Sequence, residues 1–572
     1  MSAFFTNDVS IMDYVIFAVM FLTSALISVY YGYFRSKSNS VEDYMFGGRN
    51  MPVIPVALSV MASTLSSISY IAITRETYYY GSVLLYVPLT EIVGSIFMYF
   101  FYIPIFYHHK FTSIFEYTER RYSKLVRSLG SVAYALTQVL YALITMFASC
   151  SAVSEAVLTF QQGGLRGVVW SDVLQALFMY ISIITLIVVG LLNRNTEDSF
   201  GSVIEKGGRW NHFEFDPSPY SRFTPFSTFF PGIAIPLLAA CSNQGVYQRY
   251  TSLSSFRKVK LTIILAGLSN VLFLSLVVVL GMVIFATYSN CDPVLSKRLN
   301  DSNHLMIFFA SETGKHVPGL MGLCMAGIIS ASLSSMSTII NSISCNIFED
   351  VVKPALPWRL NEKQTNYCIK GIALFFGLVV TFGNFALDVS GGIYQVFRTF
   401  ISLAGGLIVF IFGFGIFFRK ANTKGVIAGS VTGLIVTLWL GIGMQAAVSN
   451  GQIKYLTKMV TNEGCQLNST EPLPYNITTE GFVGIVPVIF DEDLPFPYRI
   501  TYNYLIGISI VVSAVIGTIV SLCTQGGEPL DESLIIPLLR KNRPNINRDY
   551  TQHAEEVRNR NNVEMRELTR RE

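Results

Sequence analysis

Residues 261–288, LTIILAGLSNVLFLSLVVVLGMVIFATY, decide the fold class because they contain no charged side chain. A helix needs about 20 apolar residues to cross a hydrocarbon core of roughly 30 Å. Residues 14–34, YVIFAVMFLTSALISVYYGYF, form a second uncharged run of sufficient length. Lipid offers no partner for an open backbone amide, so both runs are expected to be helical. The chain is therefore predicted to be an all-α polytopic membrane protein.

The composition of the whole chain supports this prediction. Of the 572 residues, 51% are apolar and only 14% are charged, whereas soluble domains carry about 25% charged residues. The first apolar run, residues 11–33, is followed by Arg35, Lys37 and Arg49. A secretory signal has its positive charge before the apolar run. The first run is therefore expected to be a retained helix with the N-terminus outside the cell.

Apolar runs predict twelve transmembrane helices within a transporter domain at 1–525. They lie near 11–33, 52–80, 82–107, 129–158, 168–192, 227–247, 258–287, 316–345, 368–387, 392–418, 423–446 and 503–523. Short loops rich in Lys and Arg stay in the cytoplasm, which places the loops at 108–127, 249–260 and 419–424 on that side. The polar segment 526–572 is expected to be a disordered cytoplasmic tail.

Glycosylation sequons mark the opposite side of the membrane. Asn468 and Asn476 begin sequons in the long loop 448–502, and Asn300 begins one after the run that ends at Tyr288. N-linked glycans are added at the exterior surface, and all three sequons fall where the basic loops predict the exterior. Two cysteines, Cys291 and Cys465, lie in polar loops, and the sequence leaves open whether they pair.

One interval breaks the alternation of sides. The loops at 108–127 and 249–260 are both predicted to be cytoplasmic, so an even number of crossings must separate them. The apolar runs give three crossings, at 129–158, 168–192 and 227–247. Either one of these runs does not span the membrane, or a helix of about 20 residues is missing from this sequence.

Several motifs resemble those of the sodium/solute symporter family, which includes the sodium–glucose transporters. They are Gly163-Gly164-Leu165 with Trp170-Ser171-Asp172-Val173-Leu174-Gln175, Asn243-Gln244-Gly245-Val246-Tyr247-Gln248-Arg249, and Pro318-Gly319-Leu320 followed by Ala326-Gly327-Ile328, Ser334-Ser335, Asn341-Ser342 and Glu349-Asp350. Further cues resemble the branch of monocarboxylate, multivitamin and iodide symporters. These are Pro55-Val56-Ala57-Leu58-Ser59, Glu76 with Tyr78 and Gly81, and Tyr288 with Cys291-Asp292-Pro293.

The resemblance implies a LeuT-like core of two inverted five-helix repeats with extra flanking helices, thirteen helices in all. The match runs to about Val157 and resumes at Gly163. Nearly all of the fourth helix of the first repeat is therefore expected to be truncated in this sequence. The alternation of sides requires the same helix. The gap is consistent with a splice variant, an error in gene prediction, or a protein that does not transport.

A sodium site is expected at a broken helix, because transporters of this kind bind ions near the membrane midplane where the backbone is interrupted. Residues 55–81 are rich in small and hydroxyl side chains, and a hard cation prefers oxygen ligands. The resemblance implies as ligands the carbonyls of Ala62, Leu65 and Ala331 and the hydroxyls of Ser334 and Ser335. The alternative is helix packing, which small residues also serve; it leads for Ser330 and Ser332.

Further site residues are also implied by the resemblance. A second sodium path found in some relatives would use Asp172, Ser337 and Thr338. Asp172 lies near the expected start of a helix, where an acid also interacts favourably with the helix dipole. The substrate pocket is expected to include Ser69, Tyr70 and Gln244.

Two adjacent charged residues allow alternative interpretations. Glu76 fits the extracellular end of a helix, with Arg75 beside it as a candidate partner. Arg75 would then either bind an organic anion or snorkel to the membrane surface.

Other functional classes find no support in the sequence. It has no P-loop and no GxGxxG helix start, which argues against a pump driven by ATP. It has no ladder of arginines, which argues against a voltage-gated channel. It has no Ser/His/Asp grouping and no Cys/His grouping, which argues against an enzyme and against a metal site other than sodium. The expected function is sodium-coupled uptake of a small organic anion across the plasma membrane by alternating access. The anion would be a monocarboxylate or a vitamin such as biotin or pantothenate. The alternatives are a non-transporting sensor, an inactive truncated isoform, or a sugar or inositol symporter of the same family; no nucleic acid partner is expected.

Overall fold

The computed structural model describes residues 10–31, 47–109, 111–149, 164–193, 198–315, 317–356, 358, 360–385, 392–465, 486–524 and 531–540. Ten helices within these ranges are long and apolar enough to cross a membrane, and two shorter apolar helices accompany them. The structure therefore confirms an all-α polytopic membrane protein.

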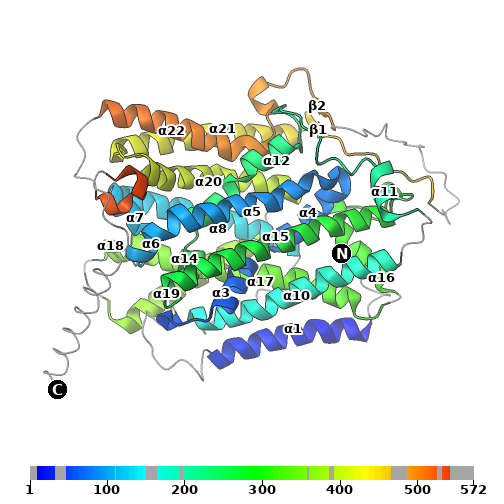
Figure 1. Cartoon of the computed structure of the whole chain (residues 1–572), viewed down its shortest axis with the longest axis horizontal. Helices are drawn as coiled ribbons and strands as arrows, with labels where there is room; N and C mark the ends of the chain where they lie inside the picture. Colours follow the sequence, from blue (N-terminus) through cyan, green and yellow to red (C-terminus); the bar gives the residue numbers. More distant parts are fainter. Residues whose placement is uncertain are drawn as a thin grey trace.

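The helices that form the bundle lie side by side across the molecule (Figure 1). They are α1 (Ile11–Val29), α3 (Val53–Thr64), α4 (Ser67–Tyr80), α5 (Tyr86–Phe97), α8 (Lys124–Ser149), α10 (Gly164–Leu192), α12 (Pro225–Gly232), α13 (Ala234–Ser242), α14 (Gln244–Thr251), α15 (Phe256–Thr287), α17 (Leu320–Ile347), α19 (Glu362–Phe385), α20 (Ile393–Phe417), α21 (Thr423–Ser449) and α22 (Leu505–Cys523). Each of the twelve predicted ranges overlaps at least one of these helices.

Short elements collect at the two ends of the bundle. The end termed here the basic end carries α6 (Ile103–His109), α7 (Glu116–Arg121) and α18 (Lys353–Ala355), at the left of Figure 1. The opposite end, termed the disulfide end, carries α11 (Phe200–Lys206), α16 (Leu305–Gly314), β1 (Ile453–Tyr455) and β2 (Val488–Phe490). Single turns are η2 (Gly47–Arg49), η3 (Gly81–Leu85), η4 (Met98–Tyr102), η5 (Ser302–His304), η6 (Phe348–Val352), η7 (Phe496–Arg499), η8 (Tyr502–Tyr504), η9 (Glu532–Leu534) and η10 (Pro537–Leu539).

Two of the predicted spans are interrupted in the structure. The first span, which was predicted to be broken, is divided into α3 and α4 at Leu65 and Ser66. The backbones of these two residues are extended (ψ 123° and 178°). The range 227–247 was expected to be one helix, and that expectation is wrong. There α13 and α14 meet at Asn243, whose side chain accepts a hydrogen bond from the Val246 amide and so starts a new helix. Helix ends leave backbone groups without partners, so each break exposes polar atoms inside the bundle.

The break in the alternation of sides is visible in the directions of the helices. Two consecutive described helices, α8 and α10, both run antiparallel to α17. The contacts are Tyr134 with Ser342 and Ser149 with Ser332 for α8, and Asp172 with Ser334 and Ser182 with Gly327 for α10. Helices α8 and α10 therefore point the same way. The expected truncation falls within residues 150–163, outside the described residues.

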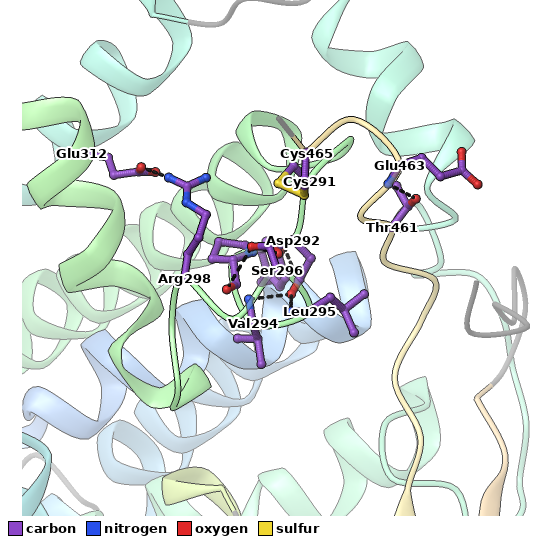
Figure 2. Close-up of a disulfide and its surroundings, with 12 residues drawn as sticks. Cys291, Asp292, Val294, Leu295, Ser296, Arg298, Glu312, Thr461, Glu463 and Cys465 are labelled. Carbon is purple, nitrogen blue, oxygen red and sulfur yellow. Dashed lines mark hydrogen bonds and ion pairs between the residues drawn. A yellow bond between two sulfur atoms is a disulfide. The ribbon is translucent and has the colours of Figure 1, made fainter. Parts of the chain in front are cut away.

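A disulfide holds together two loops at the disulfide end. Cys291, after α15, is bonded to Cys465, after β1, and the two residues are 174 positions apart in sequence (Figure 2). Next to the bond, the Asp292 amide donates to the Thr461 carbonyl at 2.8 Å. Strands β1 and β2 pair antiparallel within the loop 448–502. Of the three sequons, Asn300 is exposed, whereas Asn468 and Asn476 lie outside the described residues.

Part of the segment expected to be a disordered tail is packed at the basic end. Leu534 and Ile535 are fully buried. The Tyr117 hydroxyl donates to the Leu534 carbonyl at 3.1 Å, and Arg419 pairs with Glu532 at 2.6 Å. The expectation of disorder is therefore wrong for residues 531–540, because their apolar side chains bury against the bundle.

Candidate ion-binding site

The break between α3 and α4 faces the serine-rich centre of α17. The Ser335 hydroxyl donates to the Leu65 carbonyl, with 3.2 Å between the two oxygens. All five implied sodium ligands are buried; besides these two they are Ala62, Ala331 and Ser334. A backbone carbonyl at a helix end and two serine hydroxyls are the kind of oxygen ligands that a hard cation binds. The geometry thus brings together a carbonyl and a hydroxyl from the two elements that the sequence had paired.

Ser334 is turned toward a different partner. Its hydroxyl donates to Oδ1 of Asp172 at 2.7 Å. Ser337, one turn along α17, donates to the Ser334 carbonyl at 2.8 Å. Ser334, implied for the first ion site, therefore contacts two residues of the implied second path.

Sequence reasoning missed Tyr141 on α8. Its phenol lies near the side chains of Ser66, Ser335 and Thr145, and Ser67 donates to the Thr145 carbonyl at 2.9 Å. Tyr141 thus lies on α8 close to the helix break and to α17. A single tyrosine in an apolar run carries no signal in the sequence, because only the rotation of α8 directs its hydroxyl toward the break.

Arg249 on α14 is a second residue that sequence reasoning did not assign to the site. It is almost completely buried, and its Nη2 lies 2.9 Å from Oδ2 of Asp172. The same guanidinium donates to Ser59 at 2.7 Å and to Thr338 at 2.7 Å. Ser59 in turn donates to Asp172 at 2.5 Å. The buried carboxylate and guanidinium balance each other's charge in a place where an unpaired charge would be costly.

The placement of Asp172 corrects the earlier interpretation of its role. Helix α10 begins at Gly164, more than two turns before Asp172. The expectation that Asp172 interacts favourably with the dipole at a helix start is therefore wrong. The carboxylate is stabilised by Arg249 and two serines instead. A sodium ion on the second path would compete with this guanidinium for the same carboxylate oxygens.

Two of the residues expected in the substrate pocket make structural contacts. The Tyr70 hydroxyl donates to the Met179 carbonyl at 3.0 Å, and its ring packs edge-on against Phe273. The Gln244 side-chain amide binds backbone atoms of residues 112 and 114 at the basic end, donating and accepting at 2.9 Å. Ser69 is half-buried on α4. Of the three expectations, Ser69 is the one whose side chain has no described structural role.

A cavity of about 100 Å³ with a mostly apolar lining lies between α3, α5, α13, α14 and α15. Its polar lining consists of Thr64, Glu91, Ser95, Tyr250 and Asn270. The Asn270 amide donates to Oε2 of Glu91 at 3.1 Å. Ionisable side chains within membrane spans are usually functional. Among the described residues that line the cavity, Glu91 is the one acidic side chain and none is basic.

A buried ion cluster closes the disulfide end above the helix break. Oε1 of Glu76 lies 2.6 Å from Arg75 and 2.8 Å from Arg222. Arg222 also lies over the rings of Tyr80 and Tyr502. Arg75 has only 16% of its side chain exposed, so the prediction of a pair with Glu76 is confirmed and the snorkelling interpretation is wrong.

The helix interrupted at Leu65 and Ser66, within a bundle of membrane-spanning helices, is the architecture of transporters with a LeuT-like fold. A solved structure entitled the substrate-bound outward-open state of a Na+-coupled sialic acid symporter superposes with a TM-score of 0.73. The alignment covers 91% of this chain and 99% of that chain at 19% sequence identity. At this identity the likeness establishes the fold.

The chain belongs to the sodium:solute symporter family, whose profile matches residues 44–433. Sodium-coupled monocarboxylate transporter 1 of Xenopus laevis is 28% identical over 90% of this chain and 86% of the relative. The putative sodium-dependent multivitamin transporter of Drosophila melanogaster is 28% identical over 88% and 84%. The sodium-dependent multivitamin transporter of Oryctolagus cuniculus is 28% identical over 94% and 86%. The predicted family is confirmed, and the chain is a sodium-coupled solute symporter and not an enzyme.

Proposed function

We propose that this symporter imports a small organic anion, a monocarboxylate or a vitamin such as biotin or pantothenate, together with sodium. The observation that carries the coupling mechanism is the contact between Ser335 and the Leu65 carbonyl at a broken helix. A cation bound there would hold α3 and α17 together and stabilise one of the two conformations of the cycle, as alternating access requires. The relatives named for monocarboxylates and multivitamins support the substrate class.

The proposed sodium ligands are those implied by the sequence, namely Ala62, Leu65, Ala331, Ser334 and Ser335. We add Tyr141, because its phenol lies near both Ser66 and Ser335. Asp172, Ser337 and Thr338 remain candidates for a second path. Use of that path requires a movement of Arg249 away from Asp172.

We infer that the basic end faces the cytoplasm and that this chain resides in the plasma membrane. Cytoplasmic loops carry an excess of Lys and Arg, and the loops at 108–127, 249–260 and 419–424 all lie at this end. The opposite end holds the disulfide between Cys291 and Cys465, and disulfides persist in oxidising surroundings. Ile11 begins α1 at the disulfide end, since Asp13 accepts a hydrogen bond from the Gly322 amide. The N-terminus is accordingly proposed to be extracellular and the C-terminus cytoplasmic.

One observation favours a second candidate, a sugar or inositol symporter of the same family. The described lining of the cavity between α3, α5, α13, α14 and α15 is mostly apolar but includes Glu91 and Asn270 and no basic side chain. Carboxylate and amide groups accept and donate hydrogen bonds to hydroxyl groups, whereas a carboxylate repels an anion. If substrate binds in this cavity, a polyol fits its chemistry better than a free carboxylate does.

An uptake panel separates these candidates. Cells expressing the chain would be given labelled lactate, biotin, pantothenate, glucose or inositol, in sodium or in choline. The proposal expects sodium-dependent uptake of an acid, unchanged by Glu91→Gln, and loss of uptake in Ser334→Ala/Ser335→Ala at equal surface expression. Sodium-dependent uptake of glucose or inositol, lost in Glu91→Gln, establishes the second candidate. Lack of uptake for all five solutes would favour a sensor or an inactive truncated isoform.

A further inference from the structure

An apolar groove runs between α8, α20 and α21 and has a volume of about 260 Å³. Its walls are three stripes of side chains. They are Val126, Leu129, Val132, Ala133 and Leu136 on α8, Ala404, Leu407 and Ile411 on α20, and Val426, Ile427, Ser430, Val431 and Leu434 on α21. Twelve of these thirteen residues are apolar, so the groove suits a hydrocarbon ligand.

The groove extends over one leaflet of the membrane. On α8 it occupies residues 126–136 and on α21 residues 426–434, which at 1.5 Å per residue is about 12–15 Å. Half of a hydrocarbon core is also about 15 Å. Both helices begin at the basic end, at Lys124 and Thr423. The groove therefore reaches from the basic end to the middle of the bundle.

The groove is open toward the surroundings of the bundle. About half of the surface of Leu129, Val132, Leu136 and Val431 is exposed. In a membrane these side chains contact lipid tails, and a tail can enter the groove from the side without crossing protein.

The mouth of the groove at the basic end is positively charged. Lys424 lies on the same face of α21 as Ile427 and Val431, at helical spacings of three and seven residues. Lys124, Lys420 and Lys424 are exposed. Within the part of the chain that the structure describes, no acidic residue pairs with any of the three.

Two helix N-termini add to the positive potential at this mouth. Thr423 at the start of α21 donates to the Tyr122 carbonyl at 3.0 Å, which holds the starts of α8 and α21 together. Helix N-termini attract anions. The partial negative charge at the C-terminal end of α20 is neutralised, because Arg121 donates to the carbonyls of Gly415 and Phe418 at 3.1 and 3.0 Å.

We propose that this groove binds an anionic glycerophospholipid of the inner leaflet, with one acyl chain between α8 and α21 and the phosphate group beside Lys424 and Lys420. The inference rests on the orientation proposed above, in which the basic end faces the cytoplasm. Anionic lipids are concentrated in that leaflet, and basic pockets between helices bind their headgroups. The bound lipid would contact α8, α20 and α21 together.

Native mass spectrometry of the purified chain tests this proposal. The protein would be titrated with phosphatidylserine or with phosphatidylcholine of the same acyl chains. The wild type is expected to retain phosphatidylserine preferentially. Lys420→Ala/Lys424→Ala is expected to weaken phosphatidylserine binding roughly tenfold and leave phosphatidylcholine binding unchanged. Ser430→Phe, which fills the groove, is expected to weaken the binding of both lipids.

Matched controls separate this result from misfolding and from a failed transport assignment. Lys454→Ala removes an exposed lysine from β1 at the opposite end and is expected to bind phosphatidylserine like the wild type. Thermal unfolding of each variant without added lipid verifies the fold. Equal retention of the two lipids by the wild type, or undiminished phosphatidylserine binding by the double lysine variant, overturns the proposal. So does displacement by glycerophosphate without acyl chains. Binding is measured without transport, so a negative uptake panel leaves this test intact.

Discussion

The Ser335 hydroxyl and the Leu65 carbonyl lie 3.2 Å apart, although 270 residues separate them in the sequence. This hydrogen bond joins the centre of α17 to the end of α3, where the backbone is interrupted. The two oxygens would share a sodium ion when the site is filled, so the first prediction concerns this pair.

Ser335→Ala is expected to raise the sodium concentration for half-maximal uptake at least tenfold. Removal of a hydrogen-bonding or coordinating oxygen from a charged partner costs about 1.5–3 kcal/mol, and 1.4 kcal/mol corresponds to a factor of ten. The measurement is uptake as a function of sodium at constant ionic strength. Ser344→Ala is the control, because the Ser344 hydroxyl bonds to the Ile340 carbonyl of its own helix. A sodium dependence identical in both variants would contradict the assignment.

Asp172→Asn is expected to destabilise the chain strongly, because it leaves Arg249 buried without its counter-charge. Removal of one partner of a buried ion pair costs about 3–5 kcal/mol. The thermal midpoint of unfolding in detergent should fall markedly. The double variant Asp172→Asn/Arg249→Gln should be less destabilised than the sum of its single changes. Strict additivity would show that the two side chains do not interact in the protein as they do in the structure.

Loss of the disulfide is expected to lower the stability of the disulfide end. The bond closes a loop of 174 positions, and native disulfides typically contribute about 2–4 kcal/mol. We therefore expect the same lowered unfolding midpoint for Cys291→Ser, Cys465→Ser and the double variant. The wild type should have this lowered midpoint after the disulfide is reduced. Cys368→Ser changes a free cysteine and serves as the control. Different midpoints for the two single variants would argue against a bond between these residues.

The stability of the chain is expected to increase with pH through a contribution from Lys458. Burial lowers the pKa of the Lys458 amine to about 8, and the nearby Arg209 acts in the same direction while Glu214 opposes it. In the unfolded chain this pKa is about 10.4. Between pH 8 and 10 the unfolded chain therefore holds a proton that the folded chain has released, and the free energy of unfolding rises with pH.

Unfolding midpoints of the wild type and of Lys458→Met, recorded from pH 7.5 to 10, test this contribution. Their difference should change with pH in the stated window, since the variant lacks the titrating group. Subtraction of the two curves removes the contribution of other groups. Parallel curves would show that Lys458 titrates at its ordinary pKa.

A glycan is expected at Asn300, which is exposed at the disulfide end. The variant Asn468→Gln/Asn476→Gln retains this single sequon of the three. Its electrophoretic mobility should still increase after glycosidase treatment of protein from cells. The further change Asn300→Gln should abolish the shift. An unmodified Asn300 in folded protein at the cell surface would contradict the proposed orientation.

The sequence by itself determined the membrane class, the positions of the spans and the family, and the resemblance to that family implied the pairing of the serines of α17 with an interrupted early helix. The class, the spans and the motifs depend on local properties. An uncharged run such as 261–288 is stable only in an apolar environment. Motifs such as Asn243–Arg249 are recognised from their spacing along the chain. The count of crossings between 108–127 and 249–260 also required only the sequence, and the parallel directions of α8 and α10 agree with it.

Only the tertiary structure decided which side chains face one another across helices. Arg249 and Asp172 are 77 residues apart, Tyr78 donates to Asp292 across 214 residues, and Cys291 pairs with Cys465 across 174. The roles of Tyr70 and Gln244 depend likewise on the rotation of each helix about its axis. A hydropathy pattern specifies that a helix is buried in lipid or protein, but its rotation and depth follow from packing against neighbours. Those neighbours are distant in the chain and are brought together by folding.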